Sequence, residues 1–134
     1  MEQTITQAPP AVEYCGNNGY IKFAGIHLII EIWQGRHLDD AQKIEQILRE
    51  AIDACEANLL YMYLHNFGEG AGITGVGVLS ESHISIHSWP EFEYAALDLF
   101  VCGTKDPYKA LPVFQKGFGG KMQVTEHKRG VMPQ

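Results

Sequence analysis

Residues 79–91 read LSESHISIHSWPE, and the predicted fold depends on this stretch. In an extended chain successive side chains point to opposite faces, so Ile84 and Ile86 share one face. His83, Ser85 and His87 then share the other face. The isoleucine face is suited to a hydrophobic core. The stretch is therefore predicted to be a β-strand that buries one face and carries reactive side chains on the other.

The segments on either side of this stretch predict further strands. Their β-branched, aromatic and alternating apolar residues are typical of extended chain. Strands are expected at about residues 21–33, 59–67, 74–81, 91–103 and 121–128, with a flexible loop at 68–72. Gly75 and Gly77 in one of these strands predict a close approach of neighbouring backbone.

Two helices are expected between the strands. The first begins at Asp39 or Asp40, as a capping residue, and ends near Asn58. Its period places one apolar face toward the core, formed by Ile44, Ile47, Leu48, Ala51, Ile52 and Cys55. The second helix begins at Asp106-Pro107, and Pro112 predicts a kink or a late restart within it.

The resulting order, β-α-β-β-β-α-β, predicts an α+β fold. It is expected to be a two-layer α/β sandwich, with a mainly antiparallel sheet and the helices on one face. Residues 1–19 contain Pro9-Pro10 and a Gly-Asn-Asn-Gly turn signal, and are expected to be a poorly ordered leader. Residues 20–134 are expected to form a single domain.

Composition narrows the classes of function. The formal net charge is −6, and no basic patch interleaved with aromatics is present, which argues against a nucleic-acid partner and tolerates a cationic ligand. No apolar run approaches membrane-spanning length, and the N-terminus lacks the pattern of a signal peptide. Cys15, Cys55 and Cys102 lie far apart, which argues against a disulfide framework or a structural zinc site. A cytoplasmic location is expected.

Residue pattern alone leaves the polar face of residues 79–91 open to several interpretations. His83 and His87 lie about 13 Å apart along a strand, too far to share one metal ion, so no metal is expected. Ser82 lacks the G-x-S-x-G turn and the acid partner of a serine hydrolase. A polar sheet face with satisfied histidines is favoured by pattern alone.

The longer motif that contains these residues favours a catalytic role over a merely polar sheet face. The core E-S-H-x-x-x-H-x-W-P-E, with a Cys twenty residues after its Ser, strongly resembles the bacterial and archaeal S-adenosylmethionine decarboxylases, which use a pyruvoyl cofactor. The resemblance extends upstream through HNFGEGAGITGVGVL and GIHLIIEIW, and downstream to DPYKA and TEHKRG. It covers nearly all of the chain after about residue 24.

This resemblance implies self-cleavage between Glu81 and Ser82. The Ser82 hydroxyl would attack the Glu81 carbonyl to form an ester, which is then eliminated to leave chains 1–81 and 82–134, the second headed by a pyruvoyl group. His87 is implied as the base that removes the Ser82 Cα proton, and Thr74 as the hydroxyl that stabilises the ester. An extended strand places Ser82 and His87 on opposite faces, so a turn or bulge with a strained peptide is predicted near Ser82.

The resemblance also implies how the processed protein acts. S-adenosylmethionine would form a Schiff base with the pyruvoyl group and lose carbon dioxide, in the service of spermidine synthesis. Cys102 is implied as the proton donor and Glu91 as a ribose ligand. Phe67 is expected either to stack on adenine or simply to join the core. A homodimer of processed protomers is implied.

Alternatives remain open for the substrate and the class. Glu69 and Glu93 stand where the resemblance leads us to expect other residues. Two interpretations of these carboxylates stay open: they are solvated, or they bind a cation near the pocket. L-arginine or L-ornithine is therefore an alternative substrate with the same processing and cofactor. A non-catalytic regulatory or dimerisation homologue is an alternative of another class, disfavoured because Ser82, His87 and Cys102 are all present. His27 and His37 show no pattern that suggests a role.

Overall fold

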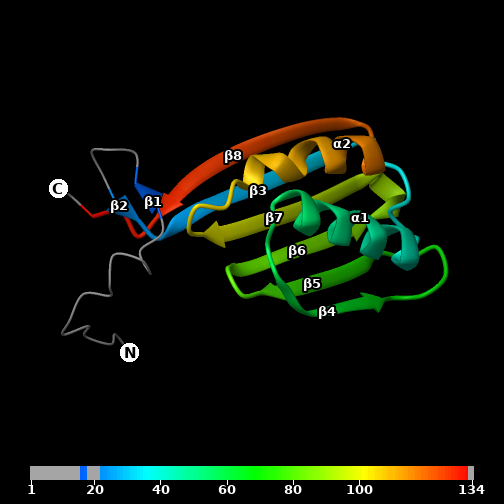
Figure 1. Cartoon of the computed structure of the whole chain (residues 1–134). Helices are drawn as coiled ribbons and strands as arrows, with labels where there is room; N and C mark the ends of the chain where they lie inside the picture. The colour runs from blue at the N-terminus through cyan, green and yellow to red at the C-terminus, as the bar shows by residue number, and fades with distance from the viewer. Residues whose placement is uncertain (1–15, 18–21, 133–134) are drawn as a thin grey trace, which may run out of the picture.

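The computed structural model describes residues 16–17 and 22–132 and has the predicted α+β architecture. A six-stranded antiparallel sheet has the order β4-β5-β6-β7-β3-β8. Two helices, α1 and α2, lie across one face of it (Figure 1). The bounds are β3 Gly25–Trp33, α1 Ala41–Ala54, β4 Leu59–Asn66, β5 Ile73–Leu79, β6 Ser82–Trp89, β7 Tyr94–Cys102, α2 Leu111–Phe118 and β8 Lys121–Arg129.

The predicted order is wrong by one strand. Four strands, not three, lie between the helices, because a tight turn at Ser80 and Glu81 separates β5 from β6. The predicted strand at 91–103 begins only at Tyr94. Pro90–Phe92 form a short 3-10 helix, η1, and Glu93 has a left-handed φ of 52°. The predicted strand at 21–33 is broken into β2 (Lys22–Phe23) and β3.

The first helix is capped as predicted but ends early. The side chain of Asp40 accepts a hydrogen bond from the Lys43 N–H at 3.1 Å, and the expected apolar face is buried. The helix ends at Ala54 and not near Asn58, because Glu56 adopts a left-handed φ of 57°.

The second helix restarts as predicted. Asp106 caps the 3-10 turn η2 (Pro107–Ala110), and α2 then begins at Leu111 with Pro112 in its first turn. Proline is tolerated there because the first N–H groups of a helix have no partner within the helix.

The core lies between the helices and the sheet. Phe114 and Phe118 of α2 are fully buried, in the same hydrophobic core that contains Ile84 and Ile86 of β6. A Cβ added to Gly75 would lie 2.9 Å from Leu64 Cγ, and one added to Gly77 would lie 2.8 Å from an Ile84 methyl carbon. The expected close approach at these glycines is therefore made by core side chains and not by backbone.

Among residues 22–132 no helix lies on the opposite face of the sheet, and we call this face the open face (Figure 1). It exposes large apolar side chains, namely Ile29, Trp33, Tyr61, Tyr63, Val76, Val78 and Trp89. Tyr94 stacks between Trp33 and Trp89, with ring centroids 4.4 and 5.3 Å away. Burial and a hydrogen bond to Glu31 raise the pKa of Tyr94 to about 12.

Two other expectations concern the chain outside the sandwich. Of the predicted leader, the structure describes only Gly16–Asn17, which form β1 and pair with β2; the rest of the leader lies outside the described residues. Within the described part of the chain, no helix combines the length and the apolar character needed to cross a bilayer.

Candidate active site

The centre of the site is the hairpin turn between β5 and β6. Leu79 pairs with Ser82, which leaves Ser80 and Glu81 as a two-residue loop. The Glu81 carboxylate accepts hydrogen bonds from the backbone N–H and the side-chain amide of Asn58, both at 2.9 Å. Desolvation raises the pKa of Glu81, but these bonds and one from Ser80 outweigh it, so the net pKa is lowered. The loop is thus tied to the residue that directly precedes β4.

Ser82 has a backbone conformation that residues with a side chain rarely adopt. Its φ is 148°. In two-residue hairpins, positive φ values usually occur within the loop itself. Here the loop residues Ser80 and Glu81 have negative φ, and the positive φ occurs at Ser82, directly after the loop. The predicted strained turn near Ser82 is therefore confirmed.

This conformation turns the Ser82 hydroxyl toward the open face. Consecutive strand residues normally point to opposite faces, yet Ser82 Oγ lies 3.3 Å from Nδ1 of the adjacent His83. On the other side of the same peptide, the Cys102 N–H donates to the Glu81 carbonyl oxygen at 3.0 Å. At the Glu81–Ser82 bond, the Ser82 hydroxyl thus faces a ring nitrogen of His83, and the Glu81 carbonyl oxygen accepts a hydrogen bond from the Cys102 N–H.

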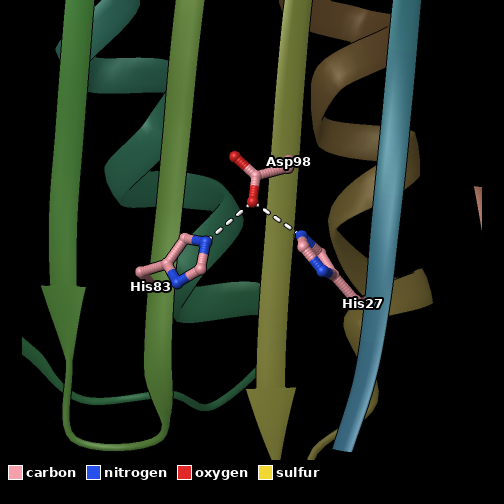
Figure 2. A group of neighbouring side chains, drawn as sticks. All are labelled: His27, His83 and Asp98. Atoms are coloured by element: carbon pink, nitrogen blue, oxygen red, sulfur yellow. Dashed lines mark hydrogen bonds and ion pairs between the residues drawn. The ribbon is translucent and has the colours of Figure 1, made fainter. Parts of the chain in front are cut away.

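Behind His83 lies a carboxylate shared by two histidines (Figure 2). His83 Nε2 and His27 Nε2 are each 2.7 Å from Oδ2 of Asp98. Ser85 donates to the other carboxylate oxygen. Burial raises the Asp98 pKa, but the bonds from Ser85, His27 and His83 together outweigh it and leave the pKa lowered. The Asp98 carboxylate is therefore ionised and accepts hydrogen bonds from three side chains.

The register of the sheet assembles this cluster. Phe100 of β7 lies between His83 of β6 and His27 of β3 in one cross-strand row, and Asp98 occupies the next row. Each histidine is thus a diagonal neighbour of Asp98. The two rings also contact Phe100, at centroid distances of 6.0 and 5.1 Å, and Arg129 Nη1 lies 3.2 Å from His27 Nδ1.

The same three side chains have the donor set of a divalent-metal site. Ligand atoms of His27, His83 and Asp98 all lie within 4.8 Å of one another. If both Nε2 atoms bound a metal, each neutral imidazole would carry its proton on Nδ1. The Nδ1 proton of His27 would then point at an N–H of Arg129, which is unfavourable. The hydrogen-bonded arrangement therefore competes with a metal. The expectation that the chain holds no metal stays a prediction.

A second pair lies further along β5 and β6. Thr74 and His87 are partners in the sheet register, and Thr74 Oγ1 is 3.1 Å from His87 Nδ1. A shallow pocket of about 270 Å³ on the open face is lined by His87 and by two members of the cluster, Asp98 and His27. The pocket therefore lies between His87 and the carboxylate cluster.

Other predicted site residues lie outside this assembly. Phe67 follows β4 at the edge of the sheet and is 64% exposed, so it does not join the core. Glu91 is exposed in η1. Glu69 and Glu93 are also exposed. Cys102 is half-buried at the end of β7, beside the hairpin turn.

Sequence reasoning missed most of the carboxylate cluster. The sequence pattern indicates no role for His27 or for Asp98. Alternation places His83 on the exposed face of its strand, but Asp98 and His27 come from two other strands. The register that brings these strands together has no signal in a single sequence.

Comparisons with known proteins agree with the fold and the motif. The family model for S-adenosylmethionine decarboxylase matches residues 26–130. The S-adenosylmethionine decarboxylase proenzyme of Methanococcus maripaludis strain C5 is 45% identical over 116 residues, covering 84% of this chain and 94% of that protein. The proenzyme of Thermomicrobium roseum is 38% identical over 114 residues, covering 84% and 98%.

A solved structure is also similar. The crystal structure of the adenosylmethionine decarboxylase from Aquifex aeolicus superposes with a TM-score of 0.76 at 26% identity, covering 84% of this chain and 95% of that one. The family model spans most of the chain, and the relatives match nearly their whole length. The chain therefore belongs to the S-adenosylmethionine decarboxylase family.

Proposed function

We propose that the chain is the precursor of an S-adenosylmethionine decarboxylase, a carboxy-lyase, and that it cleaves itself between Glu81 and Ser82. The observation that carries the proposal is the Glu81–Ser82 peptide, strained at Ser82 and held at its carbonyl by the Cys102 N–H. The relatives named as proenzymes support processing. Strain of this kind raises the energy of the amide that must be broken.

The residues present fit the formation of a pyruvoyl group from Ser82. Its hydroxyl and the Glu81 carbonyl belong to adjacent residues, and Thr74 and His87 are in contact further along the same pair of strands. We assign His87 to removal of the Ser82 Cα proton and Thr74 to stabilising the ester. Once formed, a pyruvoyl group supplies a ketone that accepts the electrons released as carbon dioxide leaves.

For the catalytic step we assign binding and proton transfer to three residues. Cys102 donates the proton to carbon after decarboxylation, which its half-buried position beside Ser82 supports. Glu91 binds the ribose and Phe67 stacks on the adenine. The 64% exposure of Phe67 leaves its ring free for such a contact.

The substrate follows from the relatives. Both proenzymes described above are named for S-adenosylmethionine, and we propose this substrate in preference to L-arginine or L-ornithine. A non-catalytic homologue is disfavoured, since Ser82, His87 and Cys102 are all retained. The cytoplasmic location and the role in spermidine synthesis stay predictions.

We further propose that processed protomers form a homodimer through the open face. Its exposed apolar side chains extend from the edge strand β4 across to β3 and are of the kind that association buries. Sedimentation analysis should give a dimer, and Val76→Lys, which places a charge on that face, should weaken it. A monomer at micromolar concentration would contradict the proposal.

Intact-mass analysis of the purified protein tests the processing. Two fragments are expected, corresponding to residues 1–81 and 82–134, with the second blocked at its N-terminus. A single uncleaved chain would contradict the proposed function. Ser82→Ala should abolish cleavage. His37→Asn serves as a control because it removes an imidazole that lies beside residues of α1 and α2, on the helix side of the sheet.

Release of carbon dioxide from S-adenosylmethionine, L-arginine and L-ornithine, measured in parallel, tests the substrate. Cys102→Ala should still be cleaved but should turn over slowly. Full turnover by that variant would show that Cys102 is not the proton donor.

A further inference from the structure

We propose that His83, held by Asp98, is the general base that activates Ser82 for the first step of self-cleavage, and that the Cys102 N–H is the donor to the oxyanion. The proposal rests on the processing described above and assigns a catalytic residue to its opening step. His83 touches the reacting atom, since its Nδ1 lies 3.3 Å from Ser82 Oγ.

The hydrogen bonds set the direction of the proton. Arg129 has only donors, so His27 Nδ1 must accept from it and His27 Nε2 carries the proton given to Asp98. The anionic Asp98 also accepts from His83 Nε2 at 2.7 Å. A neutral His83 with its proton on Nε2 has a free lone pair on Nδ1, and that nitrogen faces the Ser82 hydroxyl. The chain of bonds is therefore arranged for His83 to accept a proton.

Asp98 is the positioning residue in this arrangement. Its carboxylate holds the His83 ring in one tautomer and stabilises the imidazolium that forms when the proton arrives. The Asp98 side chain is 24% accessible, so its carboxylate is partly shielded from water. His27 and Ser85 fix the carboxylate from its other sides.

The step balances without any co-reactant. The Ser82 hydroxyl proton moves to His83 Nδ1 as Oγ bonds to the carbonyl carbon of Glu81. The carbonyl electron pair moves to its oxygen, where the Cys102 N–H, 3.0 Å away in the precursor, stabilises the charge. When the pair returns, the bond from carbon to the Ser82 nitrogen breaks, and that nitrogen takes the proton back from His83. An amide has become an ester with a free amine.

The test follows cleavage of newly made precursor over time. Chains from cell-free translation are sampled, separated by gel and identified by mass. His83→Ala should be cleaved about 100-fold or more slowly than the unaltered chain, the usual range for loss of a general base. His83→Gln, which fills the site but offers no base, should be equally slow, while His37→Asn should be cleaved at the normal rate.

Hydroxylamine at neutral pH identifies which step is blocked, because under these conditions it cleaves esters and leaves amides intact. A precursor with His87→Ala still forms the ester, so hydroxylamine should cut it and leave a hydroxamate at Glu81. A precursor with His83→Ala does not reach the ester quickly, so hydroxylamine should have little effect. Equal cutting of the two variants would overturn the proposal.

Added imidazole separates a chemical role from a structural one. It should restore at least tenfold faster cleavage to His83→Ala, by occupying the vacated space beside Ser82. It should not restore Asp98→Asn, in which the His83 ring still fills that space but loses its fixed tautomer. Nitrogen NMR of a Ser82→Ala precursor should show His83 protonated on Nε2, and Asp98→Asn should disturb this state.

The outcomes distinguish this inference from the proposed function. If the unaltered chain never yields two fragments, the proposed processing is wrong. If the unaltered chain is cleaved and His83→Ala keeps pace within threefold, His83 is not the base, while the processing and the family activity stand.

Discussion

The strain at Ser82 can be measured as a difference in stability between two unprocessed variants. Ser82→Gly and Ser82→Ala both lack the hydroxyl, so neither is cleaved, and both lose the contact with His83. They differ in backbone freedom at a φ of 148°. A residue with a Cβ held in such a region costs about 1–3 kcal/mol, which glycine avoids.

The matched control is a second serine on the same strand with ordinary backbone geometry. In a Ser82→Ala background, Ser85→Gly is compared with Ser85→Ala. Glycine should be less stable there by about 0.5–1 kcal/mol, its usual cost within a strand. Relative to this control, glycine at Ser82 should be favoured by the whole strain, about 1–3 kcal/mol, or about 4 °C in Tm for each kcal/mol.

Urea unfolding followed by circular dichroism, at one fixed protein concentration, gives the four free energies. The sign is the decisive quantity, because strand glycines normally destabilise. If glycine at Ser82 destabilises as much as glycine at Ser85, no strain is stored at the cleavage site. The link between the turn and amide attack would then be refuted.

Three further predictions concern the core and the titrating groups. Phe114→Ala should lower the free energy of unfolding by about 3–5 kcal/mol in urea titration, because the ring is fully buried; a loss under 1 kcal/mol would contradict its place in the core. Burial raises the pKa of Cys55 to about 11, so peptide mapping after alkylation at pH 8 should find Cys55 unmodified in the folded chain and modified in urea. Because the Asp98 pKa is lowered on folding, its stabilising contribution is present above about pH 4 and is lost as the pH falls through the folded value. In a Ser82→Ala background, Asp98→Asn should therefore be destabilising at pH 7, and the deficit should shrink at pH 3; a deficit independent of pH would contradict the ionised hydrogen-bonded carboxylate.

Much of the fold follows from patterns of short range. The isoleucine pair on β6, the apolar face of α1 and the Asp40 cap were all predicted from spacing within one element and are confirmed. Errors fell where local signals compete. The turn at Ser80 and Glu81 contains neither glycine nor asparagine, so the residue types do not mark the boundary between β5 and β6 as a hairpin loop.

The site divides in the same way. The long motif around Ser82 identified the family and the bond to be cleaved, and alternation placed His83 and His87 on one face. The partners of His83 come from residues 27 and 98, on other strands. A period of two determines which face a side chain occupies, whereas the register between strands determines which side chains meet across that face. Asp98 lies between two histidines only because β7 pairs with β6 on one side and with β3 on the other. Backbone hydrogen bonds along the whole length of these strands fix that register, and no local pattern in the sequence specifies it.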